Sequence, residues 1–195
     1  LDNTNNVLIQ NDLLSMTGVK YVIDSEGAIA KNNGMIYSNQ SPTESCYSSQ
    51  FLQITHKPGE IGIFETPFSM MTQEQEQTPQ CYKVVITLTE EQRKNTTYLA
   101  ADLYGGPNYD RSTEEKRFQV TEDQGQYTAY LYAQQTELAT ETIRLRILAS
   151  NNDTENSIYK VDVFKVTPVE GYRYWDKTQD GTAIYENINA KPLLY

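Results

Sequence analysis

The sequence contains few of the residues on which most metal-binding and nucleophilic sites depend. It has one histidine, His56, and two cysteines, Cys46 and Cys81, among 195 residues. A single histidine excludes most multi-histidine metal sites and permits at most one Ser–His or Cys–His arrangement. His56 lies in the turn-forming segment 55–58, so we expect an exposed histidine without a catalytic role.

The chain also lacks a long apolar run and an excess of basic residues. No stretch approaches the roughly 18 apolar residues that a membrane helix requires, so any membrane attachment is expected from segments outside this sequence. Lysine and arginine number 16 against 26 aspartates and glutamates, which gives a formal net charge of -10. Because an acidic surface repels phosphate groups, nucleic acids and anionic lipids are not expected as main ligands.

The two cysteines leave two alternatives open. Cys46 and Cys81 can close one disulfide bond, or both can remain as buried thiols. Their spacing does not decide between these states, although an extracytoplasmic location would favour the bridge.

What the sequence does contain is a series of short apolar–polar alternations. Tyrosine is abundant, with 15 residues against 5 phenylalanines, which suits sheet faces because tyrosine has β-propensity and a polar tip. The clearest alternation is at 143–147, where three aliphatic side chains face one way and Arg144 and Arg146 the other. Strands are expected at 51–55, 60–64, 82–89, 98–104, 118–120, 127–132, 143–147 and 159–166.

This spacing predicts a mainly β fold, with an antiparallel jelly-roll-like β-sandwich over residues 51–169. An immunoglobulin-like sandwich is the alternative. The two ends, 1–50 and 170–195, are expected to form a small α+β base, within which residues 31–50 are largely irregular. If the sandwich is an insertion between them, the short strands expected at 19–23 and 182–186 would pair beneath it.

The two ends of the chain also carry a family resemblance. Residues 11–24 read NDLLSMTGVKYVID and residues 181–195 read GTAIYENINAKPLLY. The first resembles the short helix and Val-Lys-Tyr strand in outer domains of large bacterial multi-pass membrane proteins of the YfhO type. The second resembles their Tyr-x-Asn strand leading to proline, at Tyr185, Asn187, Asn189, Ala190 and Pro192.

Those proteins look related to class C glycosyltransferases, which use lipid-linked sugar donors at the outer membrane face. The resemblance therefore implies an extracytoplasmic accessory domain of a bacterial membrane protein that handles lipid-linked sugars or cell-envelope glycans. The catalytic acids of such transferases lie in loops that have no counterpart here. We therefore expect no catalytic residue in this chain, and a glycan, an envelope polymer or a protein as its partner.

A free-standing carbohydrate-binding module is the second hypothesis. Tyr172, Tyr174 and Trp175 are close in sequence, and Tyr104 and Tyr109 flank a Gly-Gly-Pro turn, so stacking of these rings on sugars is conceivable. In a strand, Tyr172 and Tyr174 would share one face. The competing interpretation, which burial statistics favour, makes Trp175 a core anchor between sandwich and base. An exposed Trp175 would favour the binding module.

A glycoside hydrolase is the third and weakest hypothesis, because it requires two acids facing each other across a cleft. Its candidates are Asp102, Asp110, Asp123 and Glu141. Asp102 is notable because carboxylates are disfavoured within strands, although its side chain can simply point outward.

No cofactor is expected, and calcium is the one metal for which candidate ligands exist. Asp153 and Glu155 offer oxygen ligands close together, as do Asp176 and Asp180. Neither pair follows the EF-hand pattern.

Overall fold

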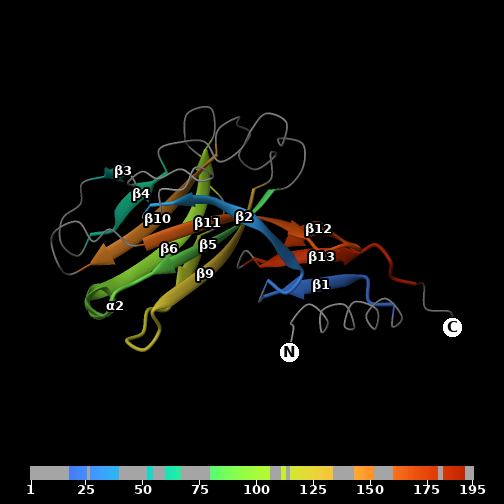
Figure 1. Cartoon of the computed structure of the whole chain (residues 1–195), viewed down its shortest axis with the longest axis horizontal. Helices are drawn as coiled ribbons and strands as arrows, with labels where there is room; N and C mark the ends of the chain where they lie inside the picture. The colour runs from blue at the N-terminus through green and yellow to red at the C-terminus, as the bar shows by residue number, and fades with distance from the viewer. Residues whose placement is uncertain are drawn as a thin grey trace.

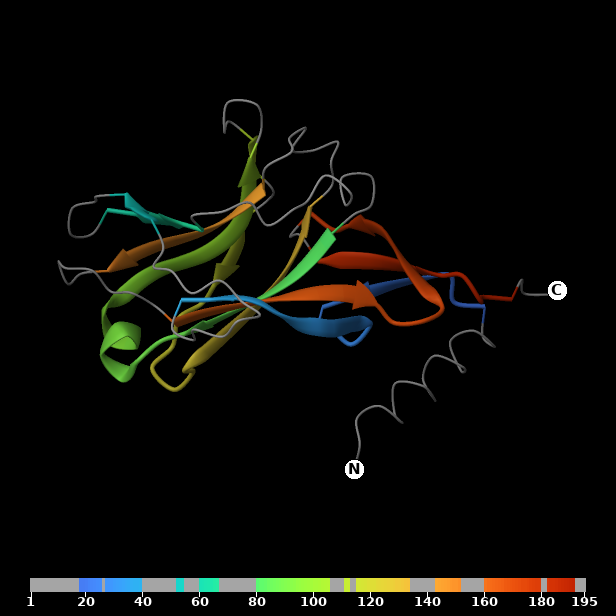
Figure 2. The ribbon, with the colours of Figure 1, turned by 45° about the horizontal axis from the view of Figure 1, so that its top comes forward.

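The computed structural model describes residues 18–25, 27–39, 52–54, 60–66, 80–105, 111–112, 115–133, 143–151, 160–179 and 182–191. Within these residues the chain is mainly β, with antiparallel strands in three sheets and one short helix (Figures 1 and 2). No helix in this part of the chain is long and apolar enough to cross a membrane. The predicted mainly β, antiparallel architecture is confirmed.

The four-stranded sheet has the order β2-β11-β5-β9. Its strands are β2 (Ala30–Ser38), β11 (Lys160–Pro168), β5 (Gln80–Thr87) and β9 (Gln126–Ala133). β5 pairs with β11 and with β9 without a register shift. The pairing of β2 with β11 contains two register shifts.

The six-stranded sheet has the order β3-β4-β10-β6-β7, and β8 also pairs with β6. Its strands are β3 (Leu52–Ile54), β4 (Gly62–Glu65), β10 (Ile143–Asn151), β6 (Thr96–Gly105), β7 (Arg111–Ser112) and β8 (Lys116–Phe118). The helix α2 (Glu90–Asn95) leads into β6, and a capping box between Thr89 and Gln92 starts it.

The third sheet joins the two ends of the described chain. It has the order β1-β13-β12, with β1 (Tyr21–Asp24), β13 (Ala183–Asn187) and β12 (Tyr172–Lys177) (Figure 1). The register places Tyr21 opposite Glu186 and Asp24 opposite Ala183. The pairing predicted between 19–23 and 182–186 is therefore confirmed.

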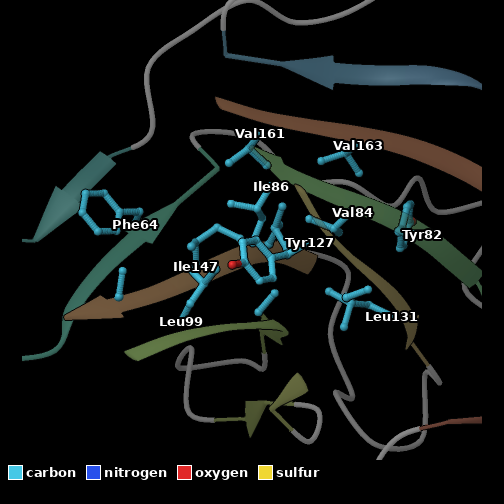
Figure 3. Packing of buried hydrophobic residues seen from close by; sticks show 14 of the residues in the cluster. Phe64, Tyr82, Val84, Ile86, Leu99, Tyr127, Leu131, Ile147, Val161 and Val163 are labelled. Atoms are coloured by element: carbon cyan, nitrogen blue, oxygen red, sulfur yellow. The ribbon is translucent and has the colours of Figure 1, made fainter. Parts of the chain in front are cut away.

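One buried cluster draws its side chains from both larger sheets (Figure 3). On β10, Leu145 and Ile147 point into it, as their alternation with Arg144 and Arg146 predicts. Burial of these aliphatic and aromatic groups is the main stabilising contribution to the fold. The largest fully buried members are Tyr37, Tyr82, Tyr127, Ile86, Leu99, Leu103, Leu145 and Ile147.

A second buried cluster lies on the opposite face of the four-stranded sheet. On β5, Cys81 belongs to this cluster while its neighbour Tyr82 belongs to the first, as expected for adjacent residues of a strand. Tyr132 of β9 stacks on Tyr174 of β12, with ring centroids 4.6 Å apart, and its hydroxyl hydrogen-bonds that of Tyr185. The three-stranded sheet is thereby held against the four-stranded sheet.

One segment differs from the prediction. Residues 31–50 were expected to be irregular, but β2 occupies 30–38 and pairs with β11. Much of β2 is exposed, so its sequence does not have the alternation of a half-buried strand. The N-terminal stretch therefore contributes to two sheets, with β1 in the three-stranded sheet and β2 in the four-stranded sheet.

Candidate functional site

The three-stranded sheet presents one face to solvent. On β1, Val22 packs on the second cluster and Asp24 is buried, so Tyr21 and Ile23 point outward with 42% and 61% exposure. On β12, Tyr172 is buried and Tyr174 packs on the same cluster, so the residues between and after them take the outer face.

Trp175 lies on this outer face. It is 51% exposed, and its ring centroid is 5.2 Å from that of Tyr21, with a tilt of 49° between the ring planes. The pairing of β12 with β13 shifts register between Tyr174 and Asp176, so Trp175 lies at an irregularity. The interpretation of Trp175 as a core anchor is therefore wrong, because Tyr172 and Tyr174 fill the inner face instead.

A row of charges lies beside these rings. Glu186 of β13 accepts a hydrogen bond from Nε of Arg173 at 2.5 Å and lies 3.6 Å from Nζ of Lys20. The hydrogen bond from Arg173 holds the pKa of Glu186 below its usual value. The Arg173 and Lys20 side chains remain 62% and 59% exposed, so both cations are accessible from solvent.

We call the set Lys20, Tyr21, Ile23, Arg173, Trp175 and Glu186 the aromatic face. It combines two exposed rings with exposed hydrogen-bond donors, which is the chemistry needed to stack on apolar sugar faces and bind hydroxyl groups. The sequence analysis missed Tyr21 and Ile23. The signal was available, because an alternating strand at 19–23 places both on one side.

The other predicted aromatic residues do not join this face. Tyr104 lies on β6 of the six-stranded sheet, is 7% exposed and donates a hydrogen bond to Oε2 of Glu65 at 2.5 Å. Burial, together with this bond to a carboxylate, raises the pKa of Tyr104 to about 12. Tyr109 lies outside the described residues.

The carboxylates considered for hydrolysis form no pair across a cleft within the described residues. Asp102 of β6 faces away from the core, as considered above, but it is 1% exposed and binds Arg146 of β10, so it is not a solvated acid. Burial raises its pKa, and the hydrogen bond from Arg146 opposes that shift. Asp123 lies in an exposed bend after β8. Asp110 and Glu141 lie outside the described residues.

The proposed metal ligands and the histidine mostly fall where the structure gives no description. Asp153, Glu155, Asp180 and His56 lie outside the described residues, and Asp176 is exposed on β12. Among the residues that are described, no group of three or more His, Cys, Asp or Glu side chains is placed to hold a metal ion.

Cys81 is a free, buried thiol in the structure. Burial raises the pKa of Cys81 to about 12, and the hydrogen bond with Tyr132 opposes that shift. The thiol is therefore protonated and unreactive at neutral pH. Its potential partner Cys46 lies outside the described residues.

No protein-family model matches this chain, and no curated protein matches it.

Proposed function

We propose that this chain is a non-catalytic, extracytoplasmic β-domain that binds glycans through the aromatic face. The observation that carries the proposal is the exposure of Trp175 in contact with Tyr21. Tryptophan is usually well buried in soluble proteins, so a half-exposed tryptophan beside a half-exposed tyrosine favours a contact surface for a ligand.

The chemistry of the face favours a sugar as the ligand. The two rings offer apolar surfaces for the C–H faces of a sugar, and Lys20 and Arg173 offer exposed donors for its hydroxyl groups. The rings are tilted by 49° and are not coplanar. We therefore expect contact with a few sugar units of a curved chain and no binding to a flat crystalline polysaccharide.

The order of the strands supports a jelly roll as the underlying fold. One sheet holds β2, β11, β5 and β9, and the other holds β4, β10, β6 and β8, so the chain passes repeatedly between the two sheets. We propose that these eight strands form the jelly-roll sandwich expected from the sequence. Lectin domains use this architecture, which agrees with glycan binding.

The cellular setting is the second part of the proposal. We infer that the chain belongs to a bacterial multi-pass membrane protein of the YfhO type and lies at the outer face of the membrane. The antiparallel pairing of β1 with β13 supports this, because a sandwich inserted into a larger protein requires its two ends to be neighbours. The full-length protein should then be membrane-associated, with this domain accessible to external protease in intact cells.

The glycan-binding proposal has a direct spectroscopic test, because Trp175 is the only tryptophan in the chain. Oligosaccharides of bacterial envelope polymers would be titrated while tryptophan emission is recorded. We expect a saturable shift of the emission to shorter wavelength as a sugar covers the ring. Trp175→Ala should weaken binding, measured by calorimetry, by roughly tenfold or more.

Ile61→Ala is the matched control, because Ile61 is also exposed, at 48%, but precedes β4 of another sheet. It should bind like the wild type. If no oligosaccharide in the panel changes the emission, or if Trp175→Ala binds as tightly as the wild type, the aromatic face is not a glycan site. Protection of the domain from protease in intact cells, with cleavage only after lysis, would instead contradict the membrane setting.

A further inference from the structure

A second candidate site lies where the three sheets meet. It is a cleft of about 410 Å³, within the usual size range of small-molecule sites. Its floor includes Lys83 and Tyr130, which are directly opposed on β5 and β9. One wall includes the opposed pair Asp24 and Ala183 of the three-stranded sheet. Lys116 of β8 enters from the six-stranded sheet.

The described lining of the cleft is cationic, although the protein is acidic. Among the described residues it includes two lysines, Lys83 and Lys116, and one carboxylate residue, Asp24. Both oxygens of Asp24 are already engaged, since they accept hydrogen bonds from the backbone of Ala28 at 2.7 Å and of Ile29 at 3.0 Å. Within the described part of the chain, the Lys83 side chain has no ion-pair or hydrogen-bond partner.

The remaining lining supplies hydroxyl groups. Thr128 and Tyr130 contribute them from β9. Thr182, which directly precedes β13, contributes one more, and its Oγ1 accepts from Nζ of Lys116 at 3.5 Å. Burial, with the charge of Asp24 as the next cause, raises the pKa of Tyr130, so its phenol stays protonated and can donate. Hydroxyl groups both donate and accept, as required for a ligand with hydroxyl groups of its own.

The position of Tyr130 is fixed by the turn between β1 and β2. Gly27 has a φ of +72°, and a Cβ atom at this position would lie 2.0 Å from Cζ of Tyr130. Only glycine permits this close approach of backbone and ring. The turn after β1 is therefore packed closely against the Tyr130 ring on the floor of the cleft.

We infer that this cleft binds an acidic sugar. Its carboxylate lies between the ammonium groups of Lys83 and Lys116, and its hydroxyl groups bind Thr128, Tyr130 and Thr182. The two cations select a negative charge, and the hydroxyl lining selects a polyol over an apolar anion. This inference does not depend on the aromatic face, which is built from other residues.

The test is a titration followed by amide NMR, with D-glucuronate as the probe and D-glucose and inorganic phosphate for comparison. We expect saturable shifts for Lys83, Thr128, Tyr130 and Thr182 with glucuronate. Glucose, which lacks the charge, should bind roughly tenfold more weakly or worse, as expected for the loss of a charge-assisted hydrogen bond. Phosphate keeps a charge but lacks the polyol, so it loses the hydrogen bonds to the hydroxyl lining and should also bind roughly tenfold more weakly.

Lys83→Gln should weaken glucuronate binding by a similar factor. The matched control is Lys94→Gln, which removes an exposed lysine from α2 and should leave the affinity unchanged. If Lys83→Gln does not fold, as judged by its amide spectrum, Lys116→Gln takes its place.

Three results would overturn the inference. They are the absence of saturable shifts with glucuronate, equal affinity for glucose or for phosphate, and unchanged affinity in the lysine variant. None of these results bears on oligosaccharide binding at Trp175, so the two proposals can fail separately.

Discussion

Asp102 and Arg146 face each other directly across β6 and β10, and the guanidinium group binds both carboxylate oxygens. Nε of Arg146 donates to Oδ1 of Asp102 at 2.9 Å, and a terminal nitrogen donates to Oδ2. Asp102 is 1% exposed, while the Arg146 side chain keeps 21% exposure. The same guanidinium lies over the ring of Tyr104, 5.0 Å from its centroid. A buried charge is thus held on the outer face of the six-stranded sheet.

Replacing Arg146 by methionine should destabilise the protein by about 3 kcal/mol, because it leaves the Asp102 carboxylate buried without its partner. Urea unfolding monitored by circular dichroism would measure the loss. The double variant Asp102→Asn/Arg146→Met removes both charges and should lose less stability than Arg146→Met alone. A double variant that is as unstable as the sum of the two single variants would show that the pair does not act as a unit.

Gly27→Ala should destabilise the protein by roughly 3 kcal/mol, from ~1 kcal/mol of left-handed strain and ~2 kcal/mol of overpacking against Tyr130. Thermal unfolding provides the measurement. The control is the same substitution in a Tyr130→Ala background, where the ring that the new Cβ atom would meet is absent. There Gly27→Ala should cost only ~1 kcal/mol, from the left-handed strain alone. Equal losses in the two backgrounds would contradict the contact with Tyr130.

The Cys81 thiol should resist alkylation in the folded protein at pH 8, because burial raises its pKa to about 12 and prevents access. A Cys46→Ser variant isolates Cys81, and mass spectrometry would follow its reaction with iodoacetamide. Reaction should become fast only in urea. Fast alkylation of the folded protein would contradict the buried position.

The raised pKa of Cys81 also has a consequence for stability. The thiol pKa is higher in the folded than in the unfolded chain, so its contribution is complete below pH 9 and is lost as the pH rises towards about 12. Cys81→Ala should therefore show a smaller fall in melting temperature than the wild type over this range. Identical alkaline profiles would rule out this contribution from Cys81.

Glu186 should make the three-stranded sheet sensitive to acid. Its pKa is lowered in the folded state by Arg173, so its contribution is present above the normal glutamate range and is lost as the pH falls through the lowered value. Glu186→Gln should show a weaker dependence of melting temperature on pH between neutral and acidic conditions. Glu170→Gln, which removes an exposed carboxylate before β12, controls for the general loss of an acidic charge.

The strands could be predicted wherever one face is buried and the other is not. Leu145 and Ile147 enter the core while Arg144 and Arg146 leave it, as the sequence pattern predicts. The same rule fails for β2, where a run of exposed residues at 31–34 replaces the alternation and the strand is held by pairing with β11. Pairing by backbone hydrogen bonds leaves little trace in side-chain hydropathy.

The candidate site was predicted only in part. Trp175 was identified as a ring that could bind sugar, but its exposure depends on Tyr172 and Tyr174 filling the inner face of β12. Tyr21 lies more than 150 positions away in the sequence and becomes its neighbour only because β1 and β12 flank β13. Contacts of this kind cannot be obtained from local patterns.

By itself, the sequence determined the mainly β class and most of the strands, because period-two burial and turn residues are local properties. The tertiary structure alone decided which polar groups meet. It brought Lys83 and Lys116 from two sheets to one cleft and placed Asp102 opposite Arg146. These placements depend on strand order and register, which are fixed by packing across the whole molecule.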